Sequence, residues 1–246
     1  MRKFGILGGL LCAGLAIAAA PAFAGIRVQP MSYDLTPSGT GTQQNLRVEN
    51  TGSTPAAVEV TVERRHILPD GSEKREPADD DFLVFPPQGI VPANGFQTFR
   101  VQYIGSPALQ KTTLYTITIA QLPVDTSNSG QSGVQIVFHL GTLAAVSPAG
   151  SKPVLQVTSV SPSSEADKLT VHISNSGNRY ARLRGGQWTL TDGAGKKEVL
   201  DADMVAKGIE QPLIEPGTER VVELPVRAGF VRAGAHADYE LNAPSK

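Results

Sequence analysis

Residues 129–148 read SGQSGVQIVFHLGTLAAVSP, a polar, glycine-rich run that passes directly into a long apolar pattern. Apolar side chains occupy every second position at Val134, Ile136, Phe138 and Leu140. This alternation predicts a β-strand with one apolar face. A strand of this kind behind a flexible loop raises the question of which hydrophobic core the apolar face covers.

Two interpretations of the four apolar side chains are open. They can cover the core of their own domain, as one face of every strand in a β-sandwich does. They can instead be kept for a partner protein, because an exposed apolar edge strand is an aggregation hazard that needs a functional reason. The alternation alone does not decide between them.

Six segments upstream also have strand character, with period-two apolar residues broken by Gly, Pro, Asn and Asp. Pro30 marks the first as an edge strand or a bulge, and the Asp-Gly pair at 70–71 predicts a tight hairpin after the third. Seven short strands over this length are typical of an immunoglobulin-like sandwich. The six segments are 26–35, 44–50, 56–68, 82–87, 96–105 and 113–124.

The composition changes at SPAGSKP (147–153), which has the character of a linker. A second set of strand patterns follows, and it predicts a second β-sandwich. The expected fold is therefore all-β, with two immunoglobulin-like sandwich domains over 25–148 and 149–246. The second strand set covers 154–162, 168–175, 180–192, 219–226 and 237–241.

The first 24 residues have the pattern of a secretory signal peptide, with Arg2 and Lys3 before an apolar stretch. The small residues around Phe23 predict cleavage after Ala24, so we expect an exported protein. Cys12 is the single cysteine and lies in this leader, so the mature chain forms no disulfide. A formal net charge of −1 gives no reason to expect nucleic acid binding, and no later apolar run predicts a membrane anchor.

The sequence lacks the patterns that catalytic and metal sites need. The four histidines, at 66, 139, 172 and 236, have no metal-ligand spacing. The acidic run ADDDF (78–82) lacks the ligand spacing of a calcium loop. No G-x-S-x-G nucleophile motif is present. We therefore expect no enzyme activity, no metal and no cofactor.

Several segments together resemble the periplasmic chaperones of pilus assembly by the chaperone–usher route, the PapD-like family. The resemblance covers essentially the whole mature chain. It rests on the leader, on the edge strand with Pro30, and on the glycine-rich loop before the apolar strand. It also rests on FPPQGIVPANGFQTFRVQY (85–103), LYTITIAQLPV (114–124) and NSGNRYARL (175–183).

The resemblance implies two immunoglobulin-like domains arranged as an L, and a periplasmic chaperone that caps pilus subunits and delivers them to an outer-membrane usher. Such a chaperone lends its seventh strand to an incomplete subunit by β-strand addition. The resemblance therefore favours donation of the alternating set Val134, Ile136, Phe138 and Leu140 to a subunit. It implies no nucleotide.

One departure concerns the subunit's C-terminal carboxylate, which the best-known members bind with an arginine on the first strand and a lysine on the seventh. The matching positions here are Ser32, or Met31 after a slip of one, and Leu143. This departure is similar to the archaic branch of the family, whose subunits resemble spore-coat protein U. A buried carboxylate needs a cation, and Arg100 is the first candidate. Arg27, Arg47, Arg64 and Arg65 are alternatives.

Three other classes of protein fit the sequence less well. A pilus subunit or surface adhesin should have one incomplete domain and an N-terminal donor extension, but here the mature chain enters a strand within a few residues. A carbohydrate or small-ligand module would need clustered exposed aromatics, and Trp188 is the single tryptophan. An enzyme lacks any catalytic constellation.

Overall fold

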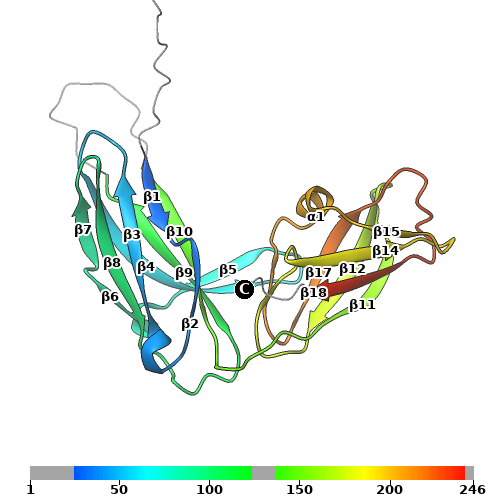
Figure 1. Cartoon of the computed structure of the whole chain (residues 1–246), viewed down its shortest axis with the longest axis horizontal. Helices are drawn as coiled ribbons and strands as arrows, with labels where there is room; N and C mark the ends of the chain where they lie inside the picture. Colours follow the sequence, from blue (N-terminus) through cyan, green and yellow to red (C-terminus); the bar gives the residue numbers. More distant parts are fainter. Residues whose placement is uncertain (1–24, 124–136, 242–246) are drawn as a thin grey trace, which may run out of the picture.

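The computed structural model describes residues 25–123 and 137–241. Two lobes built from strands meet at an angle (Figure 1). We call them the N-terminal domain, which contains β1 to β10, and the C-terminal domain, which contains β11 to β18 and one helix. The all-β, two-sandwich fold predicted from the sequence is confirmed.

The N-terminal domain packs two sheets against each other. One has the strand order β1-β3-β8-β6, and the other has the order β2-β10-β9-β4-β5, with β7 paired to β4. Their strands are Ile26–Gln29 (β1), Ser32–Leu35 (β2), Gln43–Asn50 (β3), Ala56–Ile67 (β4), Glu73–Pro77 (β5), Phe82–Phe85 (β6), Gln88–Val91 (β7), Gly95–Tyr103 (β8), Thr113–Gln121 (β9) and His139–Val146 (β10).

Alternation in the sequence explains which side chains enter this core. Phe99 and Val101 on β8 are fully buried, whereas Arg100 between them is exposed. Leu46 and Val48 on β3 are also fully buried and face the same core. The predicted first strand divides into β1 and β2, and the chain passes from one sheet to the other around Pro30.

The C-terminal domain holds three small sheets, ordered β11-β12-β17, β13-β16 and β15-β14-β18. Trp188, fully buried, lies in its core and donates its indole N–H to the Leu183 carbonyl at 2.9 Å. The elements are Leu155–Pro162 (β11), Lys168–Asn175 (β12), Ala181–Arg182 (β13), Gly186–Thr191 (β14), Lys197–Val199 (β15), Ala202–Gly208 (α1), Leu213–Ile214 (β16), Thr218–Pro225 (β17) and His236–Leu241 (β18).

The hairpin between β4 and β5 reaches across to the C-terminal domain (Figure 1). Arg220 on β17 is only 2% exposed, and its Nε donates to the Pro69 carbonyl at the hairpin tip at 3.2 Å. The Val221 N–H donates to the same carbonyl at 2.8 Å, and the Ile67 N–H donates to the Glu215 carboxylate at 2.5 Å. The hairpin therefore ties the two domains together through partly buried polar contacts.

A small apolar cluster lies beside these polar contacts and includes side chains from both domains. Leu143 and Ala145 of β10 belong to it, together with Leu213 of β16. Tyr180, next to β13, is partly buried and packs against the cluster, and burial is the main reason that its pKa is raised. The end of β10 thus lies at the junction of the two domains.

Candidate functional site: the open edge of β10

Strand β10 has a neighbour along its whole length on one side only. It pairs antiparallel with β9 from His139 to Val146. On its other side β2 pairs with it in parallel, but only from Leu143, which lies opposite Ser32, to Val146. No described strand covers β10 from His139 to Thr142 on this side. We call this uncovered side the open edge.

The direction of the backbone groups follows from two hydrogen bonds. The Leu143 N–H donates to the Met31 carbonyl at 2.9 Å, so Leu143 points its backbone groups toward β2. The Phe138 carbonyl accepts from the Gln121 N–H at 2.8 Å, so Phe138 points toward β9. Since successive residues of a strand alternate in this respect, His139 and Gly141 direct their N–H and C=O groups to the open edge.

The side chains at the start of β10 and at the two residues before it divide between two faces. Phe138 and Leu140 are partly buried and pack against the core of the N-terminal domain, which is the first of the two interpretations left open by the sequence. Val137 and His139 lie on the opposite face and are exposed. Val134 and Ile136 lie outside the described residues. Donation of the four side chains to a partner stays a prediction.

The side chain of Thr142, at the end of the open edge, is buried. The hydroxyl of Thr142 donates to the Ile117 carbonyl at 3.2 Å and lies 3.4 Å from the Tyr33 hydroxyl. Burial raises the pKa of Tyr33 to about 12. The phenol therefore stays neutral, and it places a buried hydroxyl of β2 beside Thr142 of β10 where the open edge ends.

Arginines of the C-terminal domain lie at the end of the open edge. Arg182 on β13 donates from Nη2 to the Ser32 hydroxyl at 2.6 Å, and it forms no ion pair with any described carboxylate. Arg179 pairs with Asp34 of β2 at 3.1 Å. Positive charge thus lies at the first residue of β2, where the family resemblance expects a cation from the N-terminal domain.

The predicted anchor, Arg100, lies elsewhere. It is an exposed residue of β8, opposite Asn45 on β3 and Phe85 on β6, in the sheet that does not contain β10. The structure does not bring Arg100 together with the predicted donor strand, because outward-facing residues of one sheet point away from the other.

The four alternative arginines are also apart from the end of the open edge. Arg27 and Arg47 lie on β1 and β3, in the same sheet as Arg100. Arg64 and Arg65 lie on β4 and are paired with Asp81 and Glu73. None of the five predicted cations therefore occupies the position that Arg182 holds.

Sequence reasoning missed Arg182, although a local signal was present. Arg182 stands between two buried residues, Ala181 and Leu183, so its side chain must face away from the core of the C-terminal domain. It also falls within NSGNRYARL (175–183), one of the segments that carry the resemblance. What the sequence does not contain is the packing of this segment against Ser32, which is 150 residues away.

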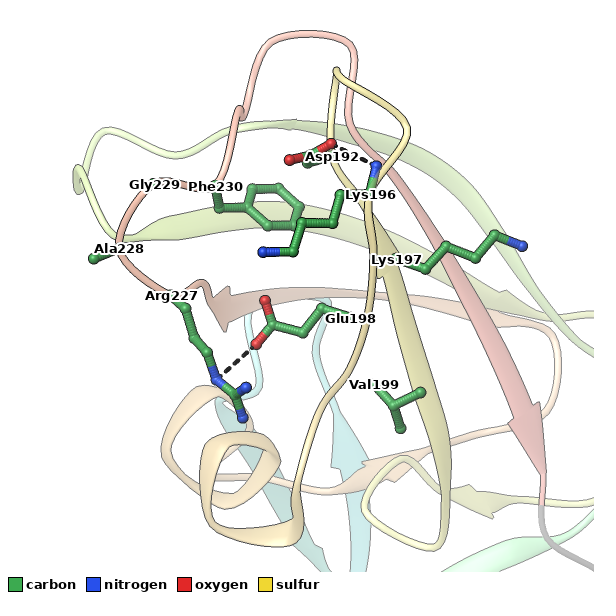
Figure 2. Close-up of a pocket in the computed structure, with 9 residues that line it drawn as sticks. All are labelled: Asp192, Lys196, Lys197, Glu198, Val199, Arg227, Ala228, Gly229 and Phe230. Atoms are coloured by element: carbon green, nitrogen blue, oxygen red, sulfur yellow. Dashed lines mark hydrogen bonds and ion pairs between the residues drawn. The ribbon is translucent and has the colours of Figure 1, made fainter.

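A hollow at the far end of the C-terminal domain is occupied by its own ion pair (Figure 2). Nε of Arg227 forms an ion pair with the Glu198 carboxylate at 2.9 Å. Asp192 accepts hydrogen bonds from the backbone N–H groups of Lys196 and Ala194, and the first of these is the main reason that its pKa is lowered. The two hydrogen bonds of Asp192 close a turn. The hollow belongs to a different part of the molecule from β10.

Two other kinds of site are absent from the described part of the chain. Among residues 25–123 and 137–241, no group of three or more His, Cys, Asp or Glu side chains is arranged to hold a metal ion. Within the same residues, no helix has the length and apolar character that a membrane span requires.

Comparisons with known proteins agree with this geometry. The family model of the pili and flagellar-assembly chaperone, PapD N-terminal domain, matches residues 32–151. The search of curated proteins gave no match.

Solved structures show the same fold at low sequence identity. The class 5 fimbriae chaperone CfaA has a TM-score of 0.59 at 15% identity, over 90% of this chain and 95% of that one. A chain of the Salmonella enterica SafA pilin–SafB chaperone complex has a TM-score of 0.55 at 18% identity, over 91% and 99%. A chain of the CsuC–CsuE pre-assembly complex from the archaic Csu pili of Acinetobacter baumannii has 0.51 at 13%, over 80% and 89%.

The matched domain contains both β2 and β10, and the fold extends over both lobes. The chain belongs to the family of PapD-like chaperones of pilus assembly.

Proposed function

We propose that this protein caps pilus subunits by adding one of their strands to the open edge of β10. The observation that carries the proposal is the row of outward-directed backbone groups at His139 and Gly141, next to a strand paired on only one side. An unpaired row of N–H and C=O groups is a template for strand addition. Val134, Ile136, Phe138 and Leu140 remain the proposed side-chain contacts with the subunit.

The orientation of the added strand follows from β2. A strand on the open edge would occupy the same position beside β10 as β2 does, and it would end where β2 begins at Ser32. If the added strand is parallel to β10, its C-terminus meets Ser32; if it is antiparallel, its N-terminus does. The positive charge of Arg182 and Arg179 at this point favours a carboxylate over an ammonium group.

We therefore assign the anchoring of the subunit's C-terminal carboxylate to Arg182 in place of Arg100. Arg182 already donates to a neutral hydroxyl, so it can turn its guanidinium to a carboxylate without leaving a buried charge unpaired. Arg179 is held by Asp34 and would add its field from nearby. In this assignment the two domains share the binding site.

The remaining parts of the proposal follow the family resemblance. We propose that the protein works in the periplasm after cleavage behind Ala24, that its subunits resemble spore-coat protein U, and that it delivers them to an outer-membrane usher. Its similarity to proteins solved as complexes with a pilin or a tip adhesin supports a subunit partner. The proposed chaperone uses no cofactor and no catalytic step.

The test compares His139→Pro with His139→Ala during co-expression with the pilus-subunit genes of the same organism. Proline removes the N–H that faces the open edge, but it leaves the pairing with β9 intact because that N–H points away from β9. It is also tolerated at the first residue of a strand. Alanine changes the side chain and keeps the N–H.

We expect His139→Ala to recover a one-to-one complex as the wild type does, and His139→Pro to recover about tenfold less or none. Thermal unfolding of both variants serves as the control for folding. Equal recovery with both variants, at equal stability, would show that the edge of β10 is not the contact.

A further inference from the structure

A hollow on the C-terminal domain begins where the open edge ends. It is lined by Arg182 and Arg179, the two arginines near Ser32, and by Tyr180 between them. Its other walls are mostly apolar or lack a charge, apart from Lys152. They comprise Ser151, Lys152, Pro153, Ala181, Gly185 and Leu241.

The apolar groups in this hollow are open to a ligand. Leu241, at the end of β18, is 45% exposed although it is a large hydrophobic residue. Tyr180 has one face against the cluster between the domains, and the guanidinium carbons of Arg179 and Arg182 lie 5.8 and 6.0 Å from its ring centroid. An apolar side chain placed here would remove water from Leu241, Pro153 and the tyrosine ring.

The hollow also has an unused polar group and no acidic side chain. The hydroxyl of Ser151 is buried and has no hydrogen-bond partner among the described residues. Two arginines and one lysine contribute positive charge to the lining. The lining therefore suits a group that is apolar at one end and negatively charged at the other.

The C-terminal residue of a chain is such a group, because its side chain and its carboxylate leave the same Cα. We infer that the hollow lined by Tyr180, Pro153 and Leu241 binds the last side chain of the subunit strand, and that it selects strands ending in a large apolar residue. This inference rests on the proposed strand addition, and it adds a specificity determinant in the C-terminal domain. Arg182 holds the carboxylate at the mouth of the hollow.

The experiment uses synthetic peptides and the mature protein. The probe is Lys-Thr-Val-Thr-Val-Thr-Val-Phe with a free carboxylate and a fluorophore on the lysine. Two further peptides change one feature each: one ends in Ser in place of Phe, and the other has a C-terminal amide. Fluorescence anisotropy gives the dissociation constant of each peptide.

We expect the Phe-ended peptide to bind about tenfold more tightly than the Ser-ended one, since the hollow removes most of one aromatic side chain from water. Leu241→Ser should abolish that difference. Its matched control is Leu83→Ser, which replaces a leucine of similar exposure, 54%, on β6 of the N-terminal domain. Arg182→Gln should remove the preference for the free carboxylate over the amide.

The outcomes separate the inference from the proposed function. If the wild type binds all three peptides equally, and His139→Pro abolishes this binding, strand addition stands and the selective hollow is overturned. If Leu241→Ser keeps the full preference for Phe, the last side chain lies elsewhere and the inference also fails. If the wild type binds none of the peptides, both the inference and strand addition at this edge are contradicted.

Discussion

The two halves of β10 are both apolar in part, but they differ in strand pairing and in burial. Both halves pair with β9, but only Leu143 to Val146 also pairs with β2. In the covered half every side chain is buried, on one face in the N-terminal core and on the other against the C-terminal domain. In the open half only Thr142 is fully buried. A single strand is thus structural at one end and available for binding at the other.

Accessibility of the backbone, and not hydrophobicity, distinguishes the candidate site from the rest of β10. Leu140 and Leu143 are the same residue type, three positions apart, yet Leu143 is 7% exposed beneath a second domain while Leu140 is only partly buried. No described strand lies beside Leu140 on the open edge, because β2 begins only at Ser32, opposite Leu143. The start of β2 therefore sets the length of the open edge.

Hydrogen exchange should give the largest contrast between the halves. The N–H groups of Leu143 and Ser147 donate to Met31 and Leu35, whereas those of His139 and Gly141 face the open edge. We expect about a thousandfold slower exchange at Leu143 and Ser147, because their exchange requires the separation of β2 from β10. Exchange measured by NMR checks this, and similar rates in both halves would mean that the open edge is covered in solution.

A matched pair of truncations should separate the halves by stability. Leu143→Ala should lower the free energy of unfolding by about 2–5 kcal/mol, as expected for a buried leucine. Leu140→Ala should cost about 1–2 kcal/mol because part of its side chain is already in water. Denaturant titration measures both. A larger loss for Leu140→Ala would contradict the assigned burial.

The smallest expected effect on stability concerns Tyr33, a buried residue of β2 opposite Ala144 in the covered half of β10. Its folded-state pKa is raised by burial from 10.0 to about 12, so its contribution to stability is full below pH 10 and is lost as the pH rises through 12. Tyr33→Phe should therefore lose less stability between these pH values than the wild type. Denaturant titrations at increasing pH, with tyrosinate absorbance as a second readout, measure this. Identical pH profiles would argue that Tyr33 is solvated.

Much of the fold could be predicted from the sequence because strand alternation is local. Buried Phe99 and exposed Arg100 follow from period two alone. Behind the glycine-rich loop the structure has the strand β10, which begins at His139 and includes Leu140 of the predicted alternating set. The short elements were missed: β5 is almost entirely charged, and α1 has only seven residues and no apolar stripe of its own. Its signal was the N-cap Asp201, which accepts from the Met204 N–H.

The candidate site could be predicted only in part, for a physical reason. The proposed donor strand has a local pattern, so the sequence alone indicates its place in the chain. The cation at its end depends on how two domains pack, and the contact of Arg182 with Ser32 joins residues that no local pattern connects. The alternation of strand residues predicts that Arg100 faces outward, and it does. However, Arg100 lies in the sheet that does not contain β10.

The contact of Arg220 with the β4–β5 hairpin has a consequence for the length of the subunit strand that we propose to bind at the open edge. The side chain of buried Arg220 and the Val221 N–H donate to Pro69. These contacts restrain the arrangement of the two domains, and with it the distance from His139 on one domain to Arg182 on the other. A strand that ends at Arg182 is thereby measured from its last residue, in steps of about 3.3 Å. A shift of one residue turns every side chain of a strand to the opposite face. In the proposed complex, the junction between the domains would therefore determine which side chains of the subunit strand face the chaperone.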